Sequence, residues 1–338
     1  MRAAIMGVGS LGTIMGALMT KNGGDVVLID ANKAHVDALN ATGAKVVGKL
    51  DLTVPVKAIT PDGMSGIYDV VFYLVKQTAN AVALKQLLPH LGPKSVVCTL
   101  QNGVPEDAVA ETVGKDRTLG CAVGWGATWM GPGVSMLTSE PDKMTFDLGE
   151  LNGVVRERTT EVAALLNLTG KAEIVTNLAG IRWAKLLVNA TMSGMSAALG
   201  CTFGDVLDNA KALTCAAHIA NESLQVAAAR EIKLEPIQGF DLTRLAFATK
   251  EERAAKVPIY NALFGPHRLL KASMLQDLEK GNRTEIDAIN GVVAEWGAKL
   301  GVPTPVNDKV VEIVKGIEAK KYSYQMSNLD FFAIPEIN

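Results

Sequence analysis

The sequence has few residues that would support a metal centre, a disulfide framework or a membrane span. It contains four cysteines and four histidines in 338 residues, all widely spaced and without a C-x-x-C pair. Zinc sites and disulfide scaffolds need closer spacings, so we expect buried cysteines and no metal site. No run approaches the roughly 20 apolar residues that a membrane-spanning helix needs, which predicts a protein without a membrane anchor.

The chain also has no excess of charge of one sign. Lysine and arginine total 33 against 35 acidic residues, for a net charge of −2. This balance excludes the positive field that binds nucleic acid or an anionic membrane surface. The apolar run over residues 1–6 follows no basic leader, so we predict a cytoplasmic protein. A 48% apolar composition and this length predict a globular chain of two domains.

The N-terminal 30 residues predict a strand, a glycine-rich turn, a helix and a second strand. An apolar run over residues 2–6 leads into Gly-Val-Gly-Ser-Leu-Gly at 7–12, followed by a helical stretch over 13–21 and an apolar run over 25–29. A glycine-rich turn between a strand and a helix is typical of a dinucleotide-binding fold.

Each glycine of this turn has its own physical reason. Gly7 permits the tight turn, Gly9 lets the backbone approach a pyrophosphate, and Gly12 lets helix and strand pack closely. The helix N-terminus that follows provides N–H groups and a positive dipole end for phosphates.

Asp30 ends the second strand, where a carboxylate accepts hydrogen bonds from the adenosine ribose and repels a 2′-phosphate. This favours NAD over NADP. Lys33 follows closely and would serve a 2′-phosphate, so NADP stays open. A turn residue before a helix starting near Asn32 is the other interpretation of Asp30.

Further apolar runs alternate with helical patterns and predict a parallel sheet. Two strand ends carry polar groups, Lys76 and the segment Gln101-Asn102-Gly103, and ligands of such sheets bind outside the carboxyl ends of the strands. The alternative for Asn102-Gly103 is a plain turn. The predicted strands cover 69–75, 95–100 and 118–123, and the helices cover 81–88 and 105–113.

Two later segments, 133–138 and 143–149, alternate like antiparallel strands and are expected to edge this sheet. Strand patterns end after residues 172–175. We therefore predict a dinucleotide-binding domain over 1–175 and an all-α domain over 176–338.

The long helix predicted over 178–199 is apolar nearly all round, which predicts burial. Lys185, Asn189, Ser193 and Ser196 nevertheless share one face of it. Burial would lower the pKa of a lysine toward the range useful for proton transfer. The alternative is a lysine that extends to solvent from the edge of the helix.

A second polar cluster, Ser273-Met-Leu-Gln-Asp and Thr284-Glu285-Ile-Asp-Ala-Ile-Asn-Gly291, is ordinary helix-surface polarity when taken alone. A loop near Gly281 would bring Ser273 and Glu285 together.

Taken in order, these motifs resemble the ketopantoate reductase (2-dehydropantoate 2-reductase) family from Gly7 to about Lys320. The motifs are the N-terminal glycine turn, Leu-Val-Lys76, Gln-Asn102-Gly, Asp147-Leu-Gly-Glu150, Trp183-Ala-Lys185-Leu-Leu-Val-Asn189, and the paired segments at Ser273 and Thr284.

The resemblance implies an α/β Rossmann domain with a doubly wound parallel sheet, then an all-α domain like the C-terminal domain of 6-phosphogluconate dehydrogenases, with the site between them. It implies that Lys185 is the general acid and that Glu285 steadies it near the nicotinamide. Asn189 would hold the substrate hydroxyl or carbonyl, and Ser273 the carboxylate. Asn102 and Lys76 would lie between cofactor and substrate.

Three positions depart from the family's pattern. Ser193 replaces an asparagine and Phe203 a further one, which puts the exact keto acid in doubt. Asp30 replaces the basic residue of NADP-dependent members, which puts the usual cofactor in doubt.

The sequence thus predicts NAD(P)H-dependent reduction of 2-dehydropantoate to (R)-pantoate. A related reductase for another 2-keto or 3-keto acid and a catalytically idle NAD-binding regulator are the alternatives. The apolar tail over 322–335 would pack on a second copy, as a homodimer, or on its own domain. The predicted substrate contacts are Asn102, Asn189, Ser193 and Ser273, and the predicted cofactor contacts are Gly7, Val8, Gly9, Ser10, Leu11, Gly12, Asp30, Lys76, Asn102, Ala127 and Glu285.

Overall fold

The computed structural model describes residues 1–237 and 239–337. By its contacts the chain divides into two compact units. The N-terminal unit comprises Met1–Gln101 and Pro105–Leu178, and the helical unit comprises Asn102–Val104 and Ala179–Asn338.

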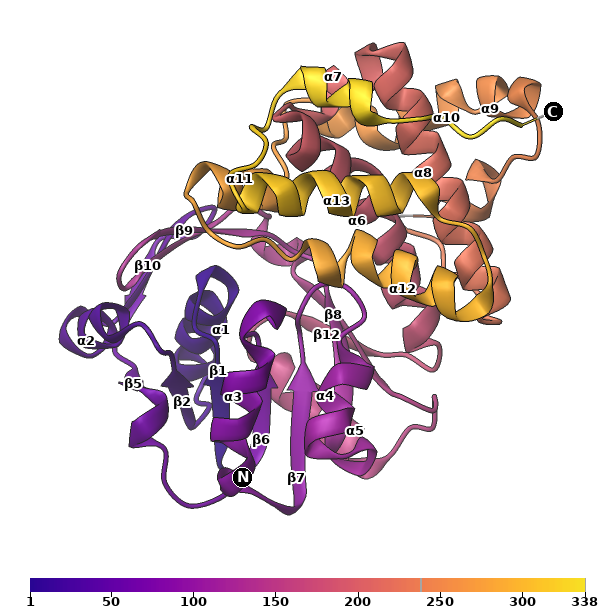
Figure 1. The fold of residues 1–338 in the computed structure, drawn as a ribbon. Coiled ribbons are helices and arrows are strands. Elements are labelled where there is room, and N and C mark those ends of the chain that lie inside the picture. The colour runs from indigo at the N-terminus through magenta and orange to yellow at the C-terminus, as the bar shows by residue number, and fades with distance from the viewer. Residues whose placement is uncertain (238, 338) are drawn as a thin grey trace. The chain divides into compact units, whose positions relative to one another are not determined.

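The N-terminal unit is built on an eight-stranded sheet in the order β12-β11-β8-β7-β6-β1-β2-β5 (Figure 1). The six strands from β5 to β8 are parallel, β11 is antiparallel to β8, and β12 is parallel to β11. The strands are β1 Ala3–Met6, β2 Val26–Ile29, β5 Lys57–Ile59, β6 Tyr68–Tyr73, β7 Leu91–Thr99, β8 Thr118–Val123, β11 Thr145–Glu150 and β12 Lys171–Ile174.

Both faces of this sheet are covered by helices. In β1, Ala3 and Ile5 join the core beneath α1, α2 and α5, whereas Ala4 and Met6 join the core beneath α3 and α4. All four side chains are buried, as expected of a parallel strand between two helical layers. The predicted doubly wound fold is confirmed. The helices are α1 Ser10–Lys21, α2 Lys33–Thr42, α3 Asn80–Leu87, α4 Glu106–Val113 and α5 Glu157–Leu166.

A second, four-stranded sheet in the order β4-β3-β10-β9 packs on α1, which therefore contacts both sheets. Its strands are β3 Ala44–Gly48, β4 Leu52–Val54, β9 Ala127–Gly131 and β10 Val134–Leu137.

This sheet corrects the expectation that 133–138 and 143–149 edge the main sheet. β10 is not in the main sheet, because it pairs with β3 and β9. β11 is antiparallel to β8, as predicted, but β12 lies outside it and forms the edge.

The helical unit is organised around α6 (Figure 1). Most side chains of this helix are buried. The predicted helix over 178–199 is confirmed. The α-helices are α6 Leu178–Leu199, α7 Phe203–Asp208, α8 Ala210–Ala229, α9 Lys250–Ala255, α10 Val257–Phe264, α11 Ser273–Glu279, α12 Asn290–Leu300 and α13 Pro305–Glu318.

A buried carboxylate fixes α13 on α8. Glu222 accepts hydrogen bonds from the backbone nitrogens of Val306 and Asn307, both at 3.0 Å, at the N-terminus of α13. Burial raises the pKa of this carboxyl. The contact satisfies helix N–H groups that would otherwise be buried without a partner.

The C-terminal tail packs on its own unit, one of the two predicted arrangements. Leu329 and Phe332 are buried in the helical core, and the Asn328 amide donates to the Ala198 carbonyl at 2.8 Å.

Candidate functional site

The glycine turn after β1 packs directly against the end of β6. Gly7 has φ of +90°, and a Cβ built on it would overlap the backbone nitrogen of Val75. A Cβ on Gly12 would lie 2.7 Å from the Gly7 carbonyl oxygen. Position 7 requires glycine for its positive φ and for the close backbone, and position 12 for the close backbone alone. Both residues therefore keep the turn tight.

Gly9 has a different environment, because it is exposed and a Cβ built on it would meet nothing within 4 Å. It is the N-cap of α1, where no side chain caps the helix. The first N–H groups of a helix have no partner within it and favour an anion. The space over Gly9 therefore fits a pyrophosphate. Val8, by contrast, is fully buried, and its carbonyl accepts a 3.2 Å hydrogen bond from the Thr13 hydroxyl.

A cavity of about 270 Å³ lies beside this turn. It occupies the carboxyl ends of neighbouring strands, where the chain leaves β1 toward one face of the sheet and β6 toward the other, the usual ligand position in such folds. The structure thus brings together four of the predicted cofactor residues, which line the cavity with Ala31 and Val75: Gly7, Gly9, Asp30 and Lys76.

Asp30 is half-buried in this cavity at the start of α2. Its Oδ1 accepts a hydrogen bond from the Asn32 backbone nitrogen at 2.8 Å, so it also serves the predicted turn. Lys33 is exposed and points its ammonium at Asp37, with contacts of 2.7 and 2.8 Å.

The strand ends of β6 and β7 are joined by Gln101, which is not among the predicted cofactor or substrate contacts. The buried Gln101 amide donates to the Val75 carbonyl at 2.5 Å and to Asn80 Oδ1 at 2.7 Å. Lys76 is the exposed residue after Val75, and Asn102 is the half-buried residue after Gln101. Gln101 therefore holds the two backbones from which Lys76 and Asn102 extend.

The remaining predicted cofactor residues in the N-terminal unit lie in the first turn of α1 and in β9. Ser10 and Leu11 are half-buried in the first turn of α1. Ala127 begins β9 in the second sheet and packs partly against the core beneath α1.

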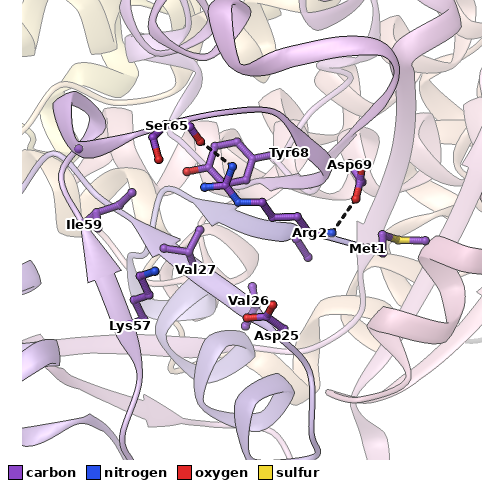
Figure 2. Close-up of a pocket in the computed structure, with 12 residues that line it drawn as sticks. Met1, Arg2, Asp25, Val26, Val27, Lys57, Ile59, Ser65, Tyr68 and Asp69 are labelled. Carbon is purple, nitrogen blue, oxygen red and sulfur yellow. Dashed lines mark hydrogen bonds between the residues drawn. The ribbon is translucent and has the colours of Figure 1, made fainter.

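A second cavity, of about 500 Å³, lies at the amino ends of the strands (Figure 2). Arg2 donates to the carbonyls of Ser65 at 2.6 Å and Ile67 at 3.3 Å, and its guanidinium lies 4.3 Å from the centre of the Tyr68 ring. The Arg2 backbone nitrogen donates to Asp69 Oδ2 at 2.7 Å. These contacts hold the loop before β6. None of the predicted cofactor or substrate contacts lines this cavity, so we assign it no role in binding the cofactor or the substrate.

In the helical unit, the polar stripe of α6 divides into two parts. Lys185, Asn189 and Ser193 are half-buried on one face of a helix whose other faces are covered. Ser196 is fully buried and donates to the Cys201 carbonyl at 2.6 Å. The expected stripe therefore presents three side chains, and Ser196 has a structural role.

Ser196 also positions the segment that carries Ser273. Its hydroxyl accepts a 3.4 Å hydrogen bond from the backbone nitrogen of Ala272, the N-cap of α11. Ser273, the first residue of α11, is exposed. Phe203, the first residue of α7, contacts the same segment, because its backbone nitrogen donates to the Leu270 carbonyl at 3.1 Å. Its side chain is buried in the core of the unit.

The start of α12 packs on the middle of α6. The buried Asn290 amide donates to the Ala190 carbonyl at 3.1 Å. A Cβ on Gly194 would overlap Asn290 Oδ1, so glycine is required for this approach. Asn189 and Ser193 immediately precede these two contact points.

Glu285 is half-buried and is the N-cap of a 3₁₀ turn over Ile286–Ala288. Its neighbour Thr284 is buried and donates both its backbone nitrogen and its hydroxyl to Glu318 Oε1, each at 2.6 Å. This fixes the backbone at Glu285 on the C-terminal end of α13. That Ser273 and Glu285 meet through the turn at Gly281 stays a prediction.

The described residues include neither a candidate metal centre nor a candidate membrane-spanning helix. They contain no group of three or more histidine, cysteine or acidic side chains placed to hold a metal ion. None of their helices is both long and apolar enough to cross a membrane.

Comparison with known proteins identifies the family. Residues 3–153 match the family described as "Ketopantoate reductase PanE/ApbA", and residues 177–318 match its "Ketopantoate reductase PanE/ApbA C terminal" part. A 2-dehydropantoate 2-reductase of Archaeoglobus fulgidus is 29% identical over 319 residues, which cover 94% of this chain and 98% of the relative. One of Streptococcus pyogenes is 28% identical over 93% of this chain and 97% of the relative.

The solved structures agree. A family ketopantoate reductase of Ralstonia eutropha is 26% identical with a TM-score of 0.81, covering 95% of this chain and 99% of the other. A D-mandelate dehydrogenase with NADH and anilino(oxo)acetate has the same fold, at 24% identity and a TM-score of 0.82 over 95% and 99% of the two chains. The chain therefore belongs to the ketopantoate reductase family of nicotinamide-dependent oxidoreductases.

Proposed function

We propose that this chain reduces 2-dehydropantoate to (R)-pantoate, with NADH as the preferred cofactor. Residues 1–175 bind the dinucleotide, and residues 176–338 supply the general acid. The observation that carries the proposal is the α6 face on which Lys185 and Asn189 are half-buried, in a helix most of whose side chains are buried. Burying a lysine ammonium costs folding energy unless the charge is paired or hydrogen-bonded, so a lysine at such a position is expected where its charge or proton is used. Proton donation is the use that this reaction needs.

Lys185 donates a proton to the C2 carbonyl oxygen of the keto acid. When bound, the reduced nicotinamide supplies a hydride to the C2 carbon. Negative charge then develops on the oxygen, and a positioned ammonium stabilises and protonates it. Glu285 steadies the Lys185 ammonium by its opposite charge.

The other proposed contacts hold the substrate in place. Asn189 lies one helical turn after Lys185 and binds the substrate hydroxyl or carbonyl. Ser273 binds the carboxylate with its hydroxyl, at the N-terminus of α11. Lys76 and Asn102 contact cofactor and substrate from the ends of β6 and β7.

The choice of NADH rests on the Asp30 carboxylate and on the ion pair between Lys33 and Asp37. A carboxylate in the cavity beside the glycine turn accepts hydrogen bonds from ribose hydroxyls and repels a 2′-phosphate. The nearby lysine that would bind such a phosphate is directed at Asp37. Both features favour NADH over NADPH.

A second candidate is reduction of a different 2-keto acid by the same Lys185. Two observations favour it: Ser193 is shorter than the family's asparagine, and Phe203 contributes a buried aromatic ring beside the Ser273 segment. Losing polar contacts to the substrate changes which acid fits. A catalytically idle regulator is the third reading, and any turnover excludes it.

The first test follows absorbance of the reduced nicotinamide with ketopantoate, using NADH and NADPH side by side. We expect oxidation with NADH at a kcat/KM at least about tenfold above that with NADPH, because a 2′-phosphate meets the Asp30 carboxylate. A preference for NADPH would overturn the Asp30 argument. No oxidation of either, with turnover of another 2-keto acid, would select the second candidate.

The Lys185→Ala variant tests the general acid. Its kcat should fall by a factor of roughly 10²–10⁴, while NADH binding stays near that of the wild type. Lys211→Ala, a half-buried lysine on α8, is the matched control and should keep full activity. Wild-type turnover in Lys185→Ala would refute this role.

Gly9→Ala tests the pyrophosphate position. A methyl group there meets no protein atom within 4 Å, so thermal stability should stay near that of the wild type. It would fill the space over the N-terminus of α1, so the Kd for NADH should rise about tenfold or more. Gly265→Ala, equally open but in the helical unit, is the control. Unchanged NADH affinity in Gly9→Ala would place the pyrophosphate elsewhere.

A further inference from the structure

A histidine that the proposed reaction does not use lies fully buried in the first turn of α2. His35 follows Asp30 by five residues, and its backbone nitrogen donates to Asn32 Oδ1 at 3.2 Å. Polar side chains buried to this degree need hydrogen-bond partners. Both ring nitrogens of His35 have one, on opposite sides of the ring.

The first partner fixes the protonation state of the ring. The Gly133 backbone nitrogen donates to His35 Nδ1 at 2.8 Å. Because Nδ1 accepts, the ring is neutral and carries its proton on Nε2. Burial lowers the pKa of His35, while the charge of Asp30 and the Val8 carbonyl oppose that shift. Asp30 is the charged group that faces the ring; α1 presents Thr13 and the β9–β10 hairpin presents Trp129, neither of which titrates.

The second partner leads into the glycine turn. His35 Nε2 lies 3.3 Å from the Thr13 hydroxyl, which lies 2.7 Å from the Gly9 carbonyl oxygen and 3.2 Å from that of Val8. With Nε2 as the donor, the Thr13 hydroxyl accepts a hydrogen bond from the ring and donates one to the carbonyl of Gly9 or Val8. The chain of hydrogen bonds therefore runs from Gly133 through His35 and Thr13 to Gly9.

The ring also contacts the second sheet. Its centre lies 4.5 Å from that of Trp129 in an edge-on arrangement, and Gly133 lies between β9 and β10. A single imidazole thus joins three parts of the N-terminal unit: the turn over which the pyrophosphate fits, the start of α2 with Asp30, and the hairpin that begins at Ala127.

We infer that His35 is a positioning residue for the dinucleotide: by donating Nε2–H to Thr13 and accepting from Gly133, it fixes the glycine turn relative to Asp30. The inference rests on the dinucleotide-binding part of the proposed function. It predicts that His35 acts on cofactor affinity and not on the chemical step, because neither ring nitrogen faces a reacting group.

Two substitutions separate the two hydrogen bonds. Asparagine reproduces the Nδ1 acceptor and lacks a donor at the Nε2 position, whereas glutamine reproduces the Nε2 donor. His35→Asn should therefore raise the Kd for NADH about tenfold, and His35→Gln should stay within about threefold of the wild type. His90→Asn, on the 3₁₀ turn Leu88–His90, is the control and should bind NADH as the wild type does.

Thr13→Val tests the chain of hydrogen bonds between His35 and the glycine turn. The double variant His35→Asn/Thr13→Val tests whether the two residues act through that same chain. Thr13→Val should weaken NADH binding about as much as His35→Asn, and the two together no more than either alone, since both interrupt one chain of hydrogen bonds. In steady state the KM for NADH should rise, with kcat at saturating NADH and the KM of the keto acid unchanged. A purely structural role would instead lower thermal stability and the active fraction without changing the Kd.

Two readouts need no cofactor. Long-range ¹H–¹⁵N NMR of the isolated protein should show His35 neutral with its proton on Nε2. Amide exchange in the first turn of α1 should speed up in His35→Asn and not in His35→Gln. A proton on Nδ1, or NADH affinities of His35→Asn and Thr13→Val equal to that of the wild type, would overturn the inference. A wild type that binds NADH but reduces no keto acid would count against the proposed substrate and leave the His35 result standing.

Discussion

The close approach of three neighbouring strand ends is the constraint on which the proposed dinucleotide site depends. Backbone hydrogen bonds continue the sheet past its last paired residues, from Gly7 to the Ile29 carbonyl at 2.9 Å and from Leu74 to the Met6 carbonyl at 2.8 Å. These bonds leave no room for a Cβ on Gly7, and they place Asp30 and Lys76 around one cavity. The glycine at position 7 therefore follows from backbone geometry before any ligand is considered.

The helical unit meets a different constraint, because its largely buried helix α6 carries polar side chains. It surrounds α6 with apolar side chains, and leaves one face half-covered at Lys185, Asn189 and Ser193. Two hydrogen bonds then tie α6 to neighbouring segments: Asn290 of α12 binds the α6 backbone, and Ser196 of α6 holds the start of α11. Such hydrogen bonds inside a core specify one packing arrangement, which the proposed proton donor on this face needs.

Local patterns were sufficient for part of the elements and insufficient for the distant partners of the strands. The β1-α1-β2 unit and α6 follow from hydrophobic period and glycine spacing, which are local. The second sheet does not, because β3 pairs with β10, some 90 residues away, and both strands are short. The different burial of Ser193 and Ser196 likewise depends on Ala272. The sequence shows Thr13 only as a hydroxyl after the glycine turn, and His35 only as a histidine after Asp30. No local pattern predicts that these two side chains contact each other.

Transfer of a labelled hydrogen tests the central claim most directly. NADH deuterated at both C4 positions is mixed with ketopantoate and the enzyme, and the product is analysed by NMR. The account predicts pantoate with deuterium on C2, formed at a much lower rate by Lys185→Ala. Pantoate without deuterium on C2, or no pantoate while another 2-keto acid takes up the label, would contradict it.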